Sequence, residues 1–260
     1  MMRFSRWGLF LIIWPGMIFP QTTAVVPEAN PGRPTVSTPA TLTPVGYLQF
    51  ESGAFGATDS PDFSKRINGS EVIKLAVHPR LQLLVDFEPL VHTNSNVQQT
   101  KFGDVVLGFQ SVLFGAEAAP AHPTLSFSFL HKVHEAGVPE VDFGAPRSSF
   151  LLLLSGDVIG FHYDANALAN ELEENATRRF QSGQTLSISH PLKGVTISGE
   201  IWHFTQPFAK GHAVGNLWAI SYPLRRNLVI DGGFDRGLTS TSTRWEAFVG
   251  FTYLLPHRLW

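Results

Sequence analysis

Apolar and polar residues alternate along most of this chain with a period of two. Successive side chains of a β-strand point to opposite faces, so the alternation predicts strands with one apolar face and one polar face. The clearest case is residues 124–133, where Leu125 and Phe127 fall on one face and Ser126 and Ser128 on the other. Clusters of Gly, Pro, Asn and Asp interrupt the pattern and predict turns between the strands.

The interrupted pattern predicts twelve strands, at residues 45–56, 70–78, 81–90, 102–114, 122–134, 147–155, 158–167, 178–190, 194–205, 211–222, 226–236 and 244–255. The gaps after the second, sixth, eighth and tenth strands are short, whereas those after the first, third, fifth and seventh are longer and polar. The gap at 115–121 fits this rhythm least well. A β-sandwich shares the alternation of faces, but regular short and long connections are typical of outer-membrane barrels. We therefore predict an all-β fold, a transmembrane antiparallel up-and-down β-barrel of about twelve strands.

The amino-acid composition is consistent with a chain that contacts lipid as well as water. Charged residues make up 15% of the sequence and apolar residues 43%. The chain contains no cysteine, which excludes disulfides, thiol catalysis and a lipid attached to cysteine. Aromatic residues near the predicted strand ends suit the girdles of the two membrane interfaces: Phe102, Trp202, Phe204, Trp218, Tyr222, Phe234, Trp245 and Tyr253.

Three regions follow from the pattern. Residues 1–24 combine a short basic start with an apolar run and predict a signal peptide, cleaved near Ala24, that exports the chain toward the outer membrane. Residues 25–44 are rich in proline, which excludes a helix or a central strand and predicts an extended periplasmic leader. Residues 45–260 form the predicted barrel. Within it, residues 164–175 depart from the strand pattern and predict a short helix, either in an extracellular loop or folded into the lumen as a constriction.

The C-terminal segment WEAFVGFTYLLPHRLW, residues 245–260, resembles the last strand of outer-membrane barrels, whose aromatic residues are recognised by the barrel assembly machinery. Pro256 interrupts it, so either Phe251 and Tyr253 form the recognised ladder or residues 255–260 form a separate tail. Together with RPTVSTPATLTPVGYLQFESG, residues 33–53, the chain looks like the outer-membrane transporter family named for the meta-pathway of phenol degradation. The resemblance covers most of the mature chain and implies passage of small, often aromatic, compounds. It defines no site residues.

If the apolar face meets lipid, the opposite face lines the lumen and is mostly acidic. A barrel of twelve strands leaves a narrow passage or a plugged cavity, wide enough for small solutes only. These acids either give weak cation preference and polar recognition, or pair with basic groups and close the lumen. The predicted lumen-lining residues are Lys74, Asp86, Glu88, Asp104, Lys132, His162, Asp164, Glu200, Asp231, Asp235 and Glu246.

The sequence therefore predicts an outer-membrane channel, without enzymatic activity, for small molecules that include aromatic or hydrophobic ones. One alternative is a non-conducting structural barrel. Another is a lipid-modifying hydrolase, because His203 and Thr205 share an outward face with Asn216 on the next strand, in an order similar to the His-x-Ser and Asn of outer-membrane phospholipase. A nucleophile requires a base within hydrogen-bond reach, and spacing along the chain leaves that open.

The expected partners are outer-membrane lipid, the barrel assembly machinery and a small solute, and nothing in the charge pattern favours nucleic acid. Arginine and lysine side chains near the predicted extracellular ends suit phosphates of lipopolysaccharide or simple solvation: Arg147, Arg178, Arg179, Lys210, Arg236 and Arg244. The ten histidines are scattered and show no metal-ligand spacing. No cofactor or metal site is expected.

Overall fold

The computed structural model describes residues 27–95, 98–115, 122–142, 146–174, 176–209 and 211–260. Within these ranges no helix has the length and apolar character needed to cross a membrane. The predicted signal peptide lies outside the described residues. The described strands are β1 (Leu48–Thr58), β2 (Lys65–His78), β3 (Leu81–Phe87), β4 (Val91–Asn94), β5 (Gln98–Lys101), β6 (Val105–Phe114), β7 (Thr124–His134), β8 (Ser148–Val158), β9 (Phe161–Glu174), β10 (Thr177–Leu192), β11 (Val195–Gln206), β12 (Gly211–Arg225), β13 (Leu228–Gly237) and β14 (Trp245–Leu254).

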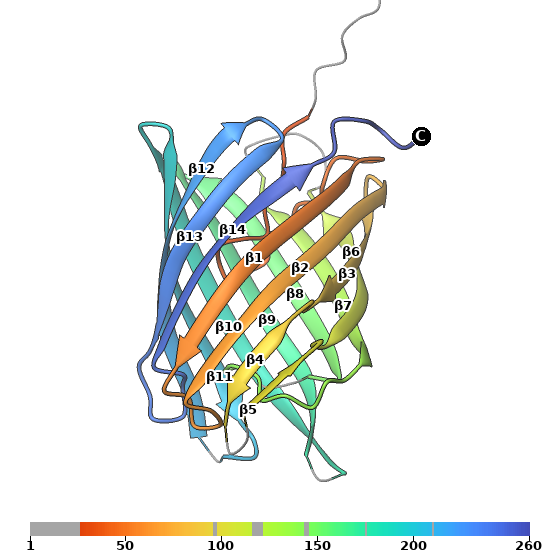
Figure 1. The fold of residues 1–260 in the computed structure, drawn as a ribbon. Helices are drawn as coiled ribbons and strands as arrows, with labels where there is room; N and C mark the ends of the chain where they lie inside the picture. The colour runs from red at the N-terminus through yellow and green to blue at the C-terminus, as the bar shows by residue number, and fades with distance from the viewer. Residues whose placement is uncertain (1–26, 96–97, 116–121, 143–145, 175, 210) are drawn as a thin grey trace, which may run out of the picture.

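The strands form one closed antiparallel sheet (Figure 1). Sequence neighbours pair around the ring, and β1 pairs with both β2 and β14, which closes it. Both β3 and β4 pair with β2, so they occupy one strand position with a break at residues 88–90. A second break, at residues 102–104, separates β5 from β6 on the next position. The fold is therefore an up-and-down barrel with twelve strand positions, as the sequence predicted.

Four turns at one end of the barrel contain two residues each: 79–80, 159–160, 193–194 and 226–227. The chain approaches β1 and leaves β14 at this same end, which we call the short-turn end; the opposite end is the long-loop end (Figure 1). Three of the turns lie two or three residues later than the sequence suggested. Lys193 and Gly194 both have positive φ, at 50° and 91°, as hairpin turns of type I′ require, and this conformation rather than the nearby proline defines the turn.

The predicted helix at residues 164–175 is wrong. Strand β9 continues through this region to Glu174 and pairs with β10 over its whole length from His162. Alternate residues of the segment, such as Asn166 and Asn170, point inward and are buried, whereas Ala167 is exposed. The Leu168 and Leu172 spacing of four residues, which suggested a helix, is equally compatible with one face of a strand.

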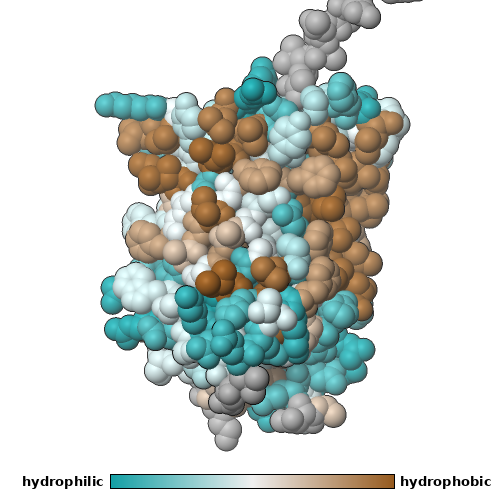
Figure 2. All heavy atoms as spheres, viewed as in Figure 1, coloured by the Kyte–Doolittle hydropathy of each residue, from teal (hydrophilic) through white to brown (hydrophobic). Residues whose placement is uncertain are grey.

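The two faces of the barrel differ as a membrane-spanning sheet requires. Exposed apolar side chains such as Ile201, Trp218 and Val249 cover the outside, and Figure 2 shows apolar residues over much of the wall with hydrophilic residues toward the long-loop end. Inward positions carry buried polar groups. Trp202 and Phe204, assigned above to an interfacial girdle, are an exception: they are 2% and 0% exposed and pack inside the barrel with Ala213.

The C-terminal segment is a strand followed by a tail. Strand β14 ends at Leu254, directly before Leu255 and Pro256. Leu255 donates a backbone hydrogen bond to Leu48, and Leu259 donates one to Gly46. Trp260 is therefore outside the ladder and is 56% exposed. Of the two possibilities that the sequence left open, the structure has the separate tail.

Replacing Ile201 with Arg tests the membrane-facing surface. Ile201 is 65% exposed in the middle of β11, so the charge would enter hydrocarbon and lower the free energy of unfolding by about 2–4 kcal/mol. The matched control is Leu238→Arg, which changes an exposed apolar residue beyond the end of β13. Urea unfolding in lipid vesicles measures both. Equal losses in the two variants would mean that Ile201 does not face lipid.

Candidate functional site: a polar cavity between two inserted segments

Residues 27–47, which we call the N-terminal segment, run inside the barrel. The segment is extended and non-helical, but it lies inside the barrel and not in the periplasm, so the predicted location is wrong. It enters beside the β12–β13 turn, where Ala29 donates to the backbone oxygen of Arg226 at 2.9 Å. Gly32 donates from its backbone nitrogen to Glu51 Oε1 at 2.9 Å, and Arg33 forms an ion pair with Asp231 at 3.2 Å.

The segment then follows the inner wall around the ring. The carboxylate of Glu200 on β11 accepts hydrogen bonds from the backbone nitrogens of Val36 and Ser37, both at 2.7 Å, and from the Ser37 hydroxyl at 2.6 Å. Further along, Thr38 bonds to Asn166 on β9 at 2.6 Å. Inward polar side chains thus serve as the backbone partners that a sheet neighbour would otherwise supply. Further wall contacts join Ala40 to Ser155 and Ser126, Pro39 to Gln110, and Thr43 to Gln82.

A second segment folds inward from the long-loop end. This β7–β8 loop comprises residues 135–147, of which 143–145 are not described. The Arg66 guanidinium donates to the backbone oxygen of Pro139 and lies 3.1 Å from Glu140 Oε2. Thr243, directly before β14, donates from its backbone nitrogen to Asp142 Oδ1 at 2.6 Å. The loop is therefore anchored at two places on neighbouring parts of the wall, because β1 pairs with both β2 and β14.

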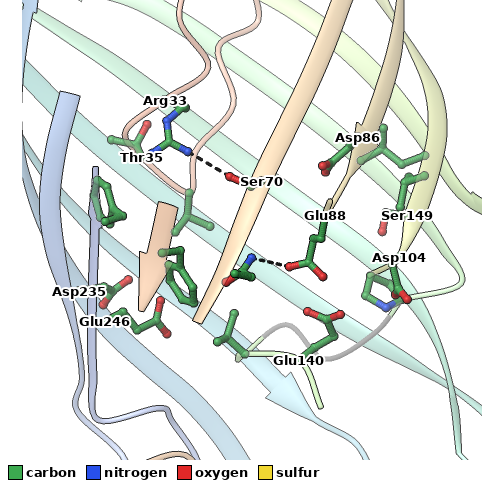
Figure 3. A pocket seen from close by; sticks show the side chains of 18 of the residues that line it. Arg33, Thr35, Ser70, Asp86, Glu88, Asp104, Glu140, Ser149, Asp235 and Glu246 are labelled. Atoms are coloured by element: carbon green, nitrogen blue, oxygen red, sulfur yellow. Dashed lines mark hydrogen bonds between the residues drawn. The ribbon is translucent and has the colours of Figure 1, made fainter. Parts of the chain in front are cut away.

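A cavity of about 440 Å³ lies between the two segments (Figure 3). Its volume falls in the range of small-molecule sites, roughly 300–1,000 Å³. The wall is mixed. Six carboxylic residues and three basic residues line it, together with apolar side chains that include Phe55, Phe204 and Phe248. The six acidic residues are Asp86, Glu88, Asp104, Glu140, Asp235 and Glu246, and the basic residues are Arg33, Arg66 and Lys132.

Each basic side chain of the cavity is already paired. Besides the Arg33 ion pair, Arg66 lies 2.6 Å from Glu88, and Lys132 forms an ion pair with Asp104. The strand breaks at residues 88–90 and 102–104 place Glu88 and Asp104 side by side, with a 3.2 Å backbone hydrogen bond from Glu88 to Asp104. Arg66 is 1% exposed, and a buried guanidinium requires such partners.

Three cavity acids form no ion pair among the described residues: Asp86, Asp235 and Glu246. The last two are register partners on β13 and β14, and Figure 3 shows them next to each other. Trp202 donates its indole N–H to Asp235 Oδ2 at 2.6 Å, but Asp235 Oδ1 is buried without a hydrogen-bond partner. Glu246 also lies close to Asp142 of the β7–β8 loop, which is a further carboxyl group and not a cationic partner.

Burial also affects the carboxyl groups of the β7–β8 loop. Burial raises the pKa of Glu140 to about 7, against the opposing effect of the Arg66 charge. Burial likewise raises the pKa of Asp142 to about 6, although the hydrogen bond from the Thr243 backbone lowers it. The seated loop therefore holds protons that a solvated loop releases near pH 4.

Six of the predicted lumen residues line the cavity: Asp86, Glu88, Asp104, Lys132, Asp235 and Glu246. Glu200 and Asp231 instead hold the N-terminal segment. Lys74 pairs with Glu51 at 2.5 Å, and Asp164 bonds to Ser155, both away from the cavity. His162 lies at the short-turn end of β9, 2.8 Å from Asp157 and 3.4 Å from Asp164.

Sequence reasoning missed the residues that the two inserted segments bring to the cavity. Arg33 falls in the predicted periplasmic leader, and Glu140 falls in the predicted gap after the fifth strand. Arg66 lay in a predicted gap because the second strand was started at residue 70, whereas β2 begins at Lys65. The alternation of faces continues toward the N-terminus through Asn68 and Arg66, which are both buried. This alternation could have extended the predicted strand to the observed start of β2.

In the part of the chain that the structure describes, no hydrogen bond on the outer face joins His203, Thr205 and Asn216, the three residues of the hydrolase alternative. The Thr205 hydroxyl accepts a hydrogen bond from the Ser182 backbone nitrogen at 2.9 Å. His203 is hydrogen-bonded to Gln184 at 2.8 Å and to His212 at 2.9 Å. Asn216 is the register partner of Ile201 rather than of His203. Among the described residues, no group of three or more His, Asp or Glu side chains is arranged to hold a metal ion.

No family model and no curated protein sequence matches this chain. Its fold is similar to that of solved outer-membrane barrels. An outer membrane channel from Pseudomonas putida F1 matches with a TM-score of 0.57 and 13% identity, over 88% of this chain and 100% of that one. A NanC porin matches with a TM-score of 0.53 and 9% identity, over 79% of this chain and 98% of that one. At these identities the similarity shows the fold.

The raised pKa values predict that the β7–β8 loop loosens as pH rises. Protonated Glu140 and Asp142 favour the seated loop below pH 4, and this advantage is lost as pH rises through about 6–7. Because the chain has no cysteine, Val138→Cys places a single thiol on the loop at a position that is 6% exposed. Maleimide labelling relative to the exposed control Glu135→Cys should rise between about pH 5 and pH 8. A constant ratio contradicts the prediction.

Proposed function

We propose that this chain is an outer-membrane channel for small molecules. The observation that carries the proposal is the closed barrel with an apolar outer wall, around a polar interior that retains a cavity of about 440 Å³. The apolar exterior supports a location in a bilayer, and closure permits the sheet to cross it because a closed sheet has no unpaired edge. The two outer-membrane proteins with similar folds support the proposal, one being a channel and the other a porin.

The inserted segments make the path narrow. The N-terminal segment bounds the cavity toward the short-turn end through Arg33–Val36, and the β7–β8 loop bounds it on the other side through Glu140 and Val141. A solute crossing the barrel passes between each segment and the wall, so small molecules are favoured over large hydrophilic ones. The aromatic and aliphatic lining supports aromatic or hydrophobic solutes, as the resemblance to the phenol-pathway transporters implied.

We further propose contacts with the envelope that the outer surface supports. Aromatic side chains on the outer face of β14, such as Trp245 and Phe251, suit the barrel assembly machinery and the lipid interface. The arginines expected to bind lipopolysaccharide are partly engaged already: Arg147 bonds to Glu173 at 3.1 Å and Arg178 to Glu171 at 3.2 Å. Their remaining donors are available for phosphate groups.

Conductance of the purified protein in planar bilayers tests the channel. Reproducible single-channel current steps in potassium chloride are expected, and they should be small because both inserted segments narrow the lumen. Heat-modifiable migration on gels verifies that the protein is folded. A folded barrel that leaves the bilayer closed to ions and does not release small solutes from vesicles would establish the non-conducting alternative.

Glu200→Ala should raise the conductance of each step. The substitution removes the carboxylate that accepts two backbone hydrogen bonds and one hydroxyl hydrogen bond from the N-terminal segment, so the segment is held less tightly in the lumen. Glu135→Ala, an exposed acid of the β7–β8 loop, is the matched control and should conduct like the unmodified protein. Unchanged conductance in Glu200→Ala would show that the segment does not limit flow.

A further inference from the structure

We propose that the cavity binds a small organic cation, an ammonium or amidinium group attached to a compact apolar body. The inference rests on the proposed function in taking the lumen to be accessible to solutes, and it specifies their chemical class. Three independent features carry it: acids without a cationic partner, a buried carboxylate oxygen without a donor, and an aromatic wall beside both.

The first feature is the excess of negative charge. All three basic side chains of the cavity are held in ion pairs with acids, whereas Asp86, Asp235 and Glu246 have none. Asp235 and Glu246 face each other across β13 and β14, and like charges in that position destabilise a sheet. A positive group between them removes this repulsion, and an anionic ligand increases it.

The second feature is the unsatisfied oxygen. Asp235 is 3% exposed, and its Oδ1 has no hydrogen-bond partner although its Oδ2 accepts the Trp202 indole N–H. Leaving a buried carboxylate oxygen without a donor costs free energy, and an N–H group of a ligand removes that cost. Because the carboxylates accept hydrogen bonds and the site needs donors, a protonated nitrogen is the complementary group.

The third feature is the apolar wall on the same strands. Phe248 is two residues from Glu246 on β14, so both side chains point into the cavity, and Phe55 on β1 is the register partner of Phe248. The guanidinium carbon of Arg33 already lies 5.9 Å from the centre of the Phe248 ring, within cation–π distance. The cavity therefore places an aromatic surface beside the carboxylates, which suits a ligand with a charged end and an apolar end.

The same geometry separates this ligand from a metal ion. Within the described part of the chain no three carboxylate or imidazole groups converge at metal-ligand spacing. The cavity is also much larger than a bare ion, and it is lined by leucine and phenylalanine side chains that a metal cannot use. A ring-sized organic cation fits within this volume and can contact both kinds of wall.

A charge series on the intact protein tests the inference. Benzylammonium, benzyl alcohol and benzoate share one ring and differ in charge, and calorimetric titration in a nonionic detergent measures their binding. We expect benzylammonium to bind at least tenfold more tightly than either of the others. Equal affinity for the amine and the alcohol, or tighter binding of benzoate, overturns the inference.

Variants locate the site. Asp235→Asn combined with Glu246→Gln removes both charges with little change in shape, and it should weaken benzylammonium binding at least tenfold while leaving benzyl alcohol unaffected. Asp62→Asn, an exposed acid between β1 and β2, is the matched control. If the double variant does not show heat-modifiable migration, Asp235→Asn alone replaces it. Benzylammonium binding that is unchanged in the folded variant overturns the assignment of the site.

Titration in detergent does not depend on ion flow, so the two proposals fail separately. A protein that binds benzylammonium selectively but shows no current has the cation site and lacks the channel activity. A protein that conducts ions but does not distinguish the three ring compounds is a channel without this site.

Discussion

Closure of the sheet is the constraint on which the rest of the structure depends. In hydrocarbon no water satisfies a strand edge, so the first and last strands must pair with each other. Ten residue pairs between β1 and β14 accomplish this. Closing at twelve strand positions fixes the width of the barrel, and at that width the inward side chains do not fill the interior. The remaining space is occupied by the N-terminal segment and the β7–β8 loop, so the lumen is a consequence of closure and insertion together.

The inner wall and the N-terminal segment are chemically matched. An extended chain inside a barrel has backbone groups that need partners, and Glu200, Asn166 and Ser155 supply them from consecutive parts of the ring. Prolines reduce the number of backbone donors that need a partner, because residues such as Pro34 and Pro39 have no N–H. The proline-rich composition that suggested a leader outside the barrel is thus equally suited to a lumen of amide, hydroxyl and carboxylate side chains.

The barrel could be predicted because its determinants are local. Period-two alternation reports which face of each strand is buried, and turn residues report where strands end, so strand number and order follow from the sequence. What could not be predicted depends on contacts between distant residues. Nothing near Arg33 indicates that it reaches Asp231, 198 positions along the chain. Similarly, Glu140 and Arg66 meet only because the β7–β8 loop turns inward, and polar loop sequences fold inward or outward without a distinctive pattern.

The acids of the lumen illustrate this limit most clearly. Glu200 and Glu246 occupy equivalent inward positions on antiparallel strands, and alternation treats them identically. Glu200 lies opposite the N-terminal segment and accepts backbone hydrogen bonds, which makes it a structural group. Glu246 forms no ion pair with the described residues of either segment, and it lines the cavity together with Asp235 and Phe248. The inserted segments therefore decide which acids stabilise the fold and which are left to interact with a solute.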